Sequence, residues 1–325
     1  MTEPIVALIT GVGGQDGGYL AERLIQDGYA VWGLARDVDT VNDVPAGVRL
    51  VTGDLRDRPA IAQLLAQCAP SMVFNLGGQS SVAASWRDPE GTMAVNAHAA
   101  TALLEECAAL QERLGRQVAV VQAASAEIFG QPATSPQDET TPIAPVSPYG
   151  QSKAIAHAAV EHWRDRGLHA SSLILYNHES PRRPASFVTR KITSTVARIA
   201  ATGEGELVLG NLAARRDWGW APEYVDAMLR AATRVEPDTY VIATGRTHAV
   251  EDFVRAAFEH AGVTGWAAHV RSDPEFFVPS DPTEQRGNAA KATDLLGWQP
   301  QMDFEDIVAA MVDADLARLT SGGLT

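Results

Sequence analysis

A glycine-rich turn near the N-terminus restricts the folds open to this chain more than any other segment. An apolar run over residues 5–10 leads into it, and a helical pattern over residues 18–27 follows it. In a strand–turn–helix unit, successive glycines permit the tight turn, let a pyrophosphate approach the backbone, and let helix and strand pack closely. The helix N-terminus adds free N–H groups and a positive dipole end. We therefore expect a bound dinucleotide, held here by Thr10, Gly11, Gly14, Gln15, Asp16 and Gly17.

The glycine spacing separates this turn from two related motifs. Gly11, Gly14 and Gly17 read G-x-x-G-x-x-G, whereas the common G-x-G-x-x-G would need a glycine in place of Asp16. A Walker loop would need Lys-Ser or Lys-Thr after its last glycine, and neither is present. Three glycines alone are a weak signal, and an empty glycine turn is the alternative. Their place between a strand and a helix favours the dinucleotide.

Strand and helix patterns alternate through the first half of the chain. Short apolar runs predict parallel strands over residues 5–10, 30–35, 48–51, 72–76, 118–122 and 171–176. Helical patterns occupy residues 18–27, 59–67, 89–110 and 149–167. This alternation predicts an α/β fold with a doubly wound parallel sheet. Ligands of such sheets lie at the carboxyl ends of the strands, where the strand order reverses.

The second half of the chain is less regular. Its patterns predict helices over residues 188–202, 223–234, 250–261 and 304–319, and strands over 206–209 and 240–243. No internal repeat or low-complexity linker separates the two halves. We predict a dinucleotide-binding domain over residues 1–176, to which about 220–245 return. Residues 177–219 and 246–325 are predicted to form a smaller mixed C-terminal substrate lobe.

The charge distribution limits the possible partners. The net charge of −14 argues against a general nucleic-acid binder. Residues 182–216 differ, because their only acids are Glu204 and Glu206. Such a segment suits a small polyanion such as a nucleotide diphosphate, and a solvated face with surface ion pairs is the alternative. Its basic residues are Arg182, Arg183, Arg190, Lys191, Arg198, Arg215 and Arg216.

Other features indicate the compartment. The acidic start runs directly into a strand and is not expected to be a signal peptide. No apolar run reaches the ~20 residues of a membrane span. Cys68 and Cys107 lie in helical patterns and are expected to be small core residues in a reducing compartment. We therefore expect a cytoplasmic protein without a membrane partner, and no metal site.

The end of the second predicted strand bears on the choice of cofactor. NAD enzymes usually carry an acid there for the ribose hydroxyls, and this chain has Ala35-Arg36-Asp37. Arg36 can pair with a 2′-phosphate, which favours NADP, although Asp37 weakens that inference and NAD stays open. After the third strand, Asp54 and Leu55 are placed to flank adenine. A simple turn acid is the alternative for Asp54.

Two segments carry candidate reactive groups. Tyr149 and Lys153 form Y-x-x-x-K at the start of a helix, so both side chains point from one face. Making a phenolate at pH 7 from a free tyrosine of pKa ~10 costs ~4 kcal/mol, and a nearby ammonium group lowers that cost. Ser125 ends the fifth strand and can share a substrate oxygen with Tyr149. Glu127 can take a proton and return it to a leaving hydroxyl, and a local turn contact is its alternative role.

Together these residues resemble the GDP-mannose 4,6-dehydratase family of the extended short-chain dehydrogenase/reductase superfamily. The resemblance covers nearly the whole chain. It rests on Thr10-Gly11, Gly14-Gln15-Asp16-Gly17 and Tyr19-Leu20-Ala21-Glu22; Asn75-Leu76 and Gln79-Ser80; Ser147-Pro148-Tyr149 and Lys153; Asn177-His178-Glu179-Ser180-Pro181-Arg182-Arg183 and Phe187-Val188-Thr189-Arg190-Lys191-Ile192; Leu209-Gly210-Asn211-Leu212 and Arg216-Asp217-Trp218-Gly219; and Val241-Ile242-Ala243-Thr244-Gly245.

The resemblance implies a Rossmann domain, a nucleotide-sugar-binding lobe and an internal redox dehydration of a GDP-sugar. NADP would oxidise the C4 hydroxyl with Tyr149 as base. Glu127 would promote loss of water between C5 and C6, and the hydride would return to C6. The product would be a 4-keto-6-deoxy sugar still attached to GDP, with no net use of reductant.

The resemblance also implies further contacts for both ligands. Those to the cofactor would come from Leu76, Gly77, Gln79, Tyr149, Lys153, Asn177, His178 and Arg183. Those to the substrate would come from Ser81, Ser125, Glu127, Tyr149, Asn177, Val188, Lys191, Leu209, Gly210, Arg216 and Asp281.

The chain departs from the family pattern at several of these places. Ser125 and Ala126 replace a threonine and a serine, and Gly77, Gly78 and Ser81 replace two alanines and a histidine. Residues 38–45 replace a serine-rich loop used in tetramer packing, so a homodimer is expected rather than a tetramer. Val278 replaces an arginine that the family has near the diphosphate, and Arg286 is a possible substitute for that arginine. Asp281 replaces a longer acid near the ribose.

Three hypotheses follow. The first is a GDP-sugar 4,6-dehydratase acting on GDP-mannose or another GDP-sugar such as a heptose. The second is a 4-keto reductase or epimerase of the same superfamily, against which Glu127 argues. The third is an inactive cofactor-binding subunit or sensor, against which the intact Ser125, Glu127, Tyr149 and Lys153 argue.

Overall fold

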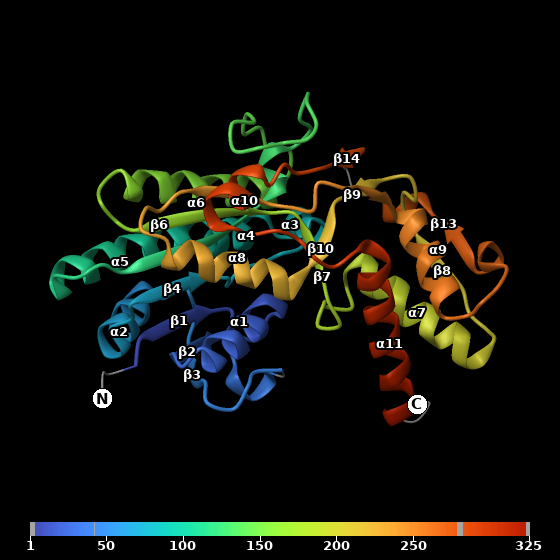
Figure 1. Ribbon diagram of the computed structural model, residues 1–325, viewed down its shortest axis with the longest axis horizontal. Coiled ribbons are helices and arrows are strands. Elements are labelled where there is room, and N and C mark those ends of the chain that lie inside the picture. Colours follow the sequence, from blue (N-terminus) through green and yellow to red (C-terminus); the bar gives the residue numbers. More distant parts are fainter. Residues whose placement is uncertain (1–3, 42, 278–281, 323–325) are drawn as a thin grey trace.

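Seven parallel strands form the central sheet of the computed structural model, which describes residues 4–41, 43–277 and 282–322 (Figure 1). Their spatial order is β11-β6-β5-β4-β1-β2-β3, so the order reverses between β1 and β4. This is the predicted doubly wound sheet, and the reversal places the ligand crevice at the carboxyl ends of these strands. The strands are β1 (Val6–Thr10), β2 (Ala30–Ala35), β3 (Arg49–Thr52), β4 (Met72–Asn75), β5 (Ala119–Ser125), β6 (Ala170–Leu175) and β11 (Thr239–Ile242).

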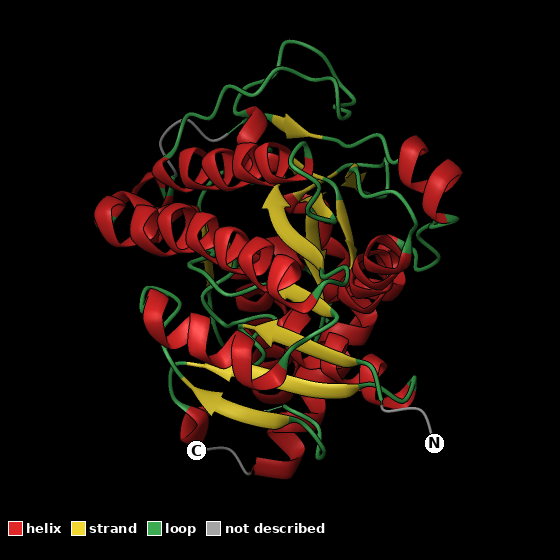
Figure 2. Ribbon diagram, turned by 90° about the vertical axis from the view of Figure 1, so that its left-hand side faces the viewer, coloured by secondary structure: helices red, strands yellow, loops and turns green. Residues whose placement is uncertain are grey.

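Helices cover both faces of the sheet (Figure 2). On one face α1 (Gln15–Gln26) and α8 (Ala221–Thr233) pack on alternate strand residues such as Ile9. On the other face α2 (Arg58–Cys68), α5 (Ala99–Leu114) and α6 (Pro148–Arg164) pack on the intervening residues such as Leu8. Successive strand residues point to opposite faces, and both faces are buried. This explains why the strands have continuous apolar sequences.

Some boundaries differ from those expected. Helix α1 begins at Gln15 rather than residue 18, because extended Gly14 is its N-cap. The helix predicted over residues 89–110 divides into α4 (Pro89–Met93), a π-helical turn (Ala94–His98) and α5, which continues to Leu114. A short helix, α3 (Val82–Arg87), precedes it and was not expected. The π-turn has a role at the site, where such turns are often found.

A second core lies beside the sheet. Helices α7 (Val188–Thr202), α9 (Val250–His260) and α11 (Phe304–Gly322) bury Ile192, Phe253 and Ile307 against one another. Short strands border it, in pairs and in a set of three. These are β7 (Asn177–Glu179) with β10 (Trp218–Trp220), β8 (Leu207–Leu209) with β13 (Val270–Ser272), and β9 (Arg215–Arg216) between β12 (His248–Ala249) and β14 (Glu284–Gln285). Helix α10 (Ala290–Leu296) packs near β11, in the core of the sheet. The division into two lobes at the boundaries given above stays a prediction.

Both cysteines of the chain lie in helices. Cys68 and Cys107 are buried thiols within them, as expected, and burial raises the pKa of Cys68 to about 12. Within residues 4–41, 43–277 and 282–322, no helix has the length and apolar character that crossing a bilayer requires.

Candidate active site

One large cavity opens at the carboxyl ends of the strands, where the strand order reverses. Its volume is about 1460 Å³. Single small-molecule sites typically measure about 300–1,000 Å³, so this cavity has room for a dinucleotide and a second ligand. All predicted site residues in the described part of the chain line it except Thr10. Asp281, with Val278, lies outside the described residues.

The glycine turn forms one wall of the cavity. Gly11 has φ +70°, and a Cβ there would lie 2.7 Å from Gly77 Cα, so only glycine fits. Thr10, expected to contact the cofactor, does not line the cavity. Its Oγ1 donates to Asn75 Oδ1 at 2.7 Å and accepts from the Gly77 N–H at 3.0 Å. Thr10 therefore fixes the turn after β1 against the loop after β4.

The start of α1 is tied to the segment after β6. Gln15 Nε2 donates to the His178 carbonyl at 3.0 Å, and Gln15 Oε1 accepts from Ser180 Oγ at 2.7 Å. His178 Nε2 lies 2.9 Å from Asp16 Oδ2, and its Nδ1 lies 2.7 Å from the Tyr176 carbonyl. Because both ring nitrogens face oxygen acceptors, the geometry favours a doubly protonated imidazolium. Burial alone lowers the pKa of His178, but the Asp16 carboxylate raises it overall.

This ion pair predicts a pH-dependent stability. The pKa of His178 is raised above 6.5, so its contribution is complete below that pH and is lost as pH rises through the folded-state value. The pKa of Asp16 is lowered below 3.8, so its contribution is lost only as pH falls through a still lower value. The substitution His178→Gln should reduce the free energy of unfolding by about 2 kcal/mol near pH 6 and by less near pH 9.

Urea unfolding of both proteins at the two pH values checks this prediction. His178 also stacks on Tyr224, with ring centroids 4.6 Å apart, and the loss of that contact does not depend on pH. The difference between the two pH values therefore isolates the ion pair. An equal cost at both would contradict the prediction.

The candidate base lies in the first turn of α6. Ser147 Oγ caps this helix by accepting from the Gly150 N–H at 3.0 Å. Tyr149 is almost fully buried, and burial raises its pKa to about 12, opposed by a hydrogen bond with Ser125 and reinforced by Glu127. Lys153 Nζ lies 5.8 Å from the centre of the Tyr149 ring and donates to the Ala123 carbonyl at 2.9 Å. Burial lowers the pKa of Lys153 to about 8, so the amine is mostly protonated at pH 7.

The expected lowering of the Tyr149 pKa by Lys153 is therefore not present in the chain alone. Burial outweighs the groups that lower this pKa, which are the Ser125 hydroxyl and the Arg183 charge, and a pKa of about 12 makes the phenolate cost about 7 kcal/mol at pH 7. Tyr149 becomes a usable base only when a bound ligand brings further positive charge next to it.

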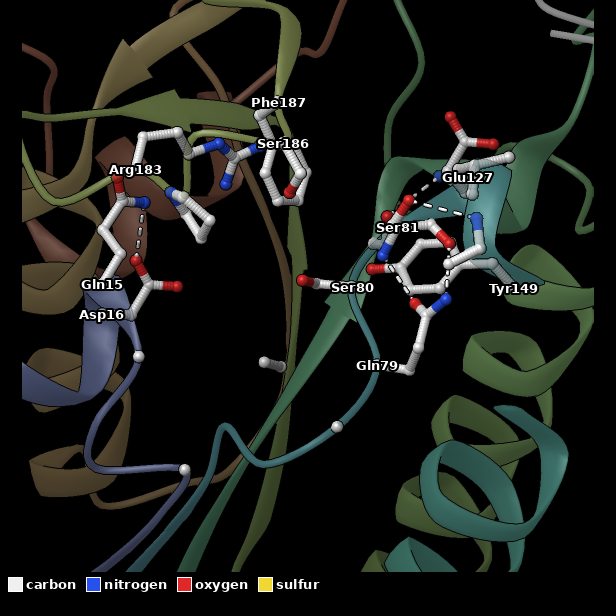
Figure 3. A pocket seen from close by; sticks show the side chains of 18 of the residues that line it. Gln15, Asp16, Gln79, Ser80, Ser81, Glu127, Tyr149, Arg183, Ser186 and Phe187 are labelled. Carbon is white, nitrogen blue, oxygen red and sulfur yellow. Dashed lines mark hydrogen bonds between the residues drawn. The ribbon is translucent and has the colours of Figure 1, made fainter. Parts of the chain in front are cut away.

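Glu127 faces Tyr149 across the same end of the cavity. Ser125 ends β5, and its Oγ accepts from the Glu127 N–H at 3.3 Å, which opens a 3₁₀ turn at Ala126–Phe129. Gln285 Nε2 donates to Glu127 Oε1 at 2.8 Å. Figure 3 shows Glu127 and Tyr149 together with Gln79 and Ser81 on one side of the cavity. Gln15, Asp16 and Arg183 lie on the opposite side.

The loop carrying Gln79 and Ser81 is fixed by the π-turn. Asn96 in that turn accepts from the Gln79 N–H at 2.9 Å and donates to the Gln79 carbonyl at 2.8 Å and to Ser152 Oγ at 3.2 Å. Ser81 Oγ in turn caps α3. The unexpected helix and the π-turn therefore hold the loop after β4 against α6.

At the far end of the glycine wall, charged residues surround the position expected for a ribose. Arg56 binds Asp54, with Nη2 2.6 Å from Oδ2, and holds the pKa of Asp54 at about 2. Asp37 accepts from the Asp39 N–H at 3.0 Å, within its own loop. No hydrogen bond or ion pair joins the Arg36 guanidinium to another side chain in the described part of the chain. Arg36 is therefore a cation available to a ligand, while Asp54 both lines the cavity and makes a local turn contact.

The opposite end of the cavity is formed by the basic segment and its neighbours. Lys191 Nζ lies 4.4 Å from the centre of the Phe276 ring. Arg216 is almost buried, and its Nη1 donates to the carbonyls of Arg215 and Pro282 at 2.7 and 2.9 Å. A Cβ at Gly210 would lie 2.6 Å from the Phe276 carbonyl oxygen, so glycine is required there. Asn177, Arg183, Val188 and Leu209 complete the predicted residues at this end.

The basic residues of the segment other than Arg198 fall into two groups. Lys191, Arg183 and Arg216 line the cavity, and Arg183 Nε also lies 3.2 Å from Glu179 Oε2 in an ion pair. Arg182, Arg190 and Arg215 form ion pairs with Glu22, Asp315 and Glu284, away from its lining. The first group suits a polyanion such as a nucleotide diphosphate, and the second group forms the ion pairs of the alternative interpretation. Arg286, suggested as a substitute for the missing arginine, does not line the cavity.

Sequence reasoning missed several lining residues. Arg56 was visible two positions after Asp54, and its spacing could have indicated the ion pair. Several others lie in loops, in a 3₁₀ turn or in two- and three-residue strands, where no periodic pattern exists. They include Phe187, Trp218, Phe276, Phe277 and Gln285.

Comparisons with known proteins identify the family. A family model described as GDP-mannose 4,6 dehydratase matches residues 8–311. GDP-mannose 4,6 dehydratase 1 of Arabidopsis thaliana is 42% identical over 325 residues, which cover 96% of this chain and 90% of that protein. GDP-mannose 4,6 dehydratase of Homo sapiens is 38% identical over 341 residues, covering 96% and 91%.

Among solved structures, the UDP-glucose 4-epimerase of Thermus thermophilus in complex with NAD superposes with a TM-score of 0.85 at 26% identity. The superposition covers 98% of this chain and 100% of that chain. It supports the Rossmann-type fold, while the sequence matches above reach along nearly the whole chain. On that evidence, the chain belongs to the GDP-mannose 4,6-dehydratase family.

Proposed function

We propose that this protein is a GDP-sugar 4,6-dehydratase that uses an internal hydride transfer. The observation that carries the proposal is the pairing of Tyr149 and Ser125 with Glu127 at one end of a cavity whose other wall is the glycine turn. A reductase or epimerase acting at C4 needs a base but no second acid–base group. Membership of a dehydratase family supports the same assignment.

The cavity fits a nicotinamide dinucleotide. The side-chain-free wall at Gly11 and Gly14 suits a pyrophosphate beside the N-terminus of α1, and Arg36 suits a 2′-phosphate. When bound, this group supplies the acceptor and later the donor of one hydride. We therefore propose NADP as the cofactor, held at those residues, with Asp54 and Leu55 beside its adenine end.

The chain's own residues move the protons. Tyr149 accepts the proton of the C4 hydroxyl as that carbon is oxidised to a ketone, which acidifies the hydrogen at C5. Glu127 removes the C5 proton and returns it to the C6 oxygen, so that the C6–O bond breaks and water leaves as the C5–C6 double bond forms. The 4-keto-6-deoxy sugar would result when C6 gains the hydride and C5 gains a proton, which balances the proton that Tyr149 took from the C4 hydroxyl. Lys191 and Arg216, which line the cavity, would hold the diphosphate side of the substrate, and Arg183 would contact the cofactor.

Mass spectrometry of the product tests the proposal. The purified protein is incubated with GDP-mannose or with a GDP-heptose, without added reductant. We expect a product lighter by one water from at least one of them. If the mass of neither GDP-sugar changes in the presence of protein shown to contain its cofactor, the proposal is wrong. A product that appears only when NADPH is consumed would favour the reductase alternative, and tight binding without turnover would favour an inactive subunit.

The preference for NADP predicts the effect of one substitution. Arg36→Ala removes the cation at the ribose end, and a charged hydrogen bond of about 1.5–3 kcal/mol corresponds to about 10- to 100-fold weaker binding of NADP. The affinity for NAD should change by less than about threefold. Titration of the cofactor-free protein with both dinucleotides checks this, and Arg49→Ala, on the neighbouring strand β3, is the matched control. Equal losses for the two dinucleotides would contradict the assignment of NADP.

The expected homodimer and the cytoplasmic location stay predictions. Size-exclusion chromatography with light scattering distinguishes the dimer from the tetramer.

A further inference from the structure

Gln285 is a buried amide at the candidate catalytic end that has no part in the mechanism above. It lies on β14, is 4% exposed, and lines the cavity. Its Nε2 donates to Glu127 Oε1 at 2.8 Å, across 158 residues of sequence. Burying a primary amide is costly unless it is hydrogen bonded, and here its partner is the proposed acid–base group.

The backbone around Gln285 is held by β9, the strand that carries Arg216. In the pairing of β14 with β9, Gln285 stands opposite Arg216. The Arg215 N–H donates to the Thr283 carbonyl at 2.9 Å, and the Asp217 N–H donates to the Gln285 carbonyl at 3.1 Å. Arg216 Nη1 donates to the Pro282 carbonyl. The position of the amide is therefore set by backbone and side-chain contacts from β9.

We propose that Gln285 is a positioning residue for Glu127. This proposal rests on the proposed dehydratase function. An amide N–H bonded to a carboxylate favours its ionised form, the form that removes the C5 proton. The bond also restricts rotation of the carboxylate, so that its oxygen is aimed at the substrate before the reaction. Because an amide does not titrate near neutral pH, this donor stays in place throughout the catalytic cycle.

If Gln285 positions Glu127, elimination depends on Gln285, whereas substrate binding and oxidation at C4 do not depend on it. Gln285→Met keeps the length of the side chain and removes the N–H donor. We expect kcat for dehydration to fall about 10- to 100-fold, as for the loss of one hydrogen bond to a charged group. KM for GDP-mannose should change less than about threefold. Reduced nicotinamide, followed by its absorbance, should accumulate in a single turnover because C4 is still oxidised.

A second variant and a control separate this role from a general effect on the fold. Gln285→Glu keeps the shape and places a like charge beside Glu127, so it should lose elimination at least as strongly. Thr283→Ala alters an exposed side chain on the same segment and should leave kcat unchanged. Thermal unfolding and titration with GDP-mannose establish that each variant is folded and binds substrate.

The outcomes distinguish the inference from the function on which it rests. Absence of dehydration by the unaltered protein would remove the proposed function. Dehydration by the unaltered protein with kcat unchanged in Gln285→Met would overturn the role of Gln285 alone. A parallel loss of substrate binding, cofactor reduction and dehydration in both variants would also overturn it, since that pattern indicates a structural role.

Discussion

Tyr149→Phe is expected to lower kcat for dehydration about 100- to 10,000-fold, the usual contribution of a general base. The substitution removes only the hydroxyl, which lies beside Ser125 at the end of β5. Without it, the proton of the C4 hydroxyl has no acceptor and oxidation at C4 does not begin. The variant should therefore show neither product nor reduced nicotinamide. Single-turnover absorbance and mass spectrometry of the product measure both.

Tyr240→Phe is the matched control for this substitution. Tyr240 is fully buried on β11, does not line the cavity, and its hydroxyl has no hydrogen-bond partner within the described residues. It should retain full activity. Substantial turnover by Tyr149→Phe would mean that another group accepts the proton, and the role given to Tyr149 would be wrong.

Glu127→Gln is expected to block the later step only. Glutamine preserves the shape of the side chain but cannot take up the C5 proton. Dehydration should fall about 100- to 10,000-fold, while C4 is still oxidised and reduced nicotinamide accumulates. The accumulation sets this variant apart from Tyr149→Phe, in which both signals are lost. The two substitutions therefore assign the two proton transfers to two different residues.

Glu139→Gln serves as the control for a carboxylate-to-amide change. Glu139 accepts from the Val241 N–H at 2.7 Å outside the cavity lining, and glutamine keeps an acceptor oxygen. Its activity should be unchanged. Normal dehydration by Glu127→Gln would show that Glu127 is a turn residue, which was its alternative role.

The sheet and the glycine turn were predictable because each has a local signature. A parallel strand that is buried on both faces needs a continuous apolar run, and β2 was placed to the residue. Tyr149 and Lys153 were predictable for the same reason, since their spacing alone places them on one face of α6. These features depend on neighbours within a few residues.

Other features of the site depend on distant contacts. Gln285 reaches Glu127 through a two-residue strand, which is too short to produce a pattern. The raised pKa of Tyr149 results from burial by several elements, so a nearby lysine could not predict its direction. Asn96 acts through a π-turn inside what the sequence presents as one helix. Residues of this kind become visible only when the folded chain brings them together.

In the proposed mechanism, hydride leaves C4 and returns to C6 of the same sugar. GDP-mannose carrying deuterium at C4 tests it most directly, with the product examined by mass spectrometry and nuclear magnetic resonance. We predict that the product retains the label and carries it at C6, even when unlabelled NADPH is present in solution. A dehydrated product without deuterium at C6, or one whose label is diluted by the added NADPH, would contradict the internal transfer.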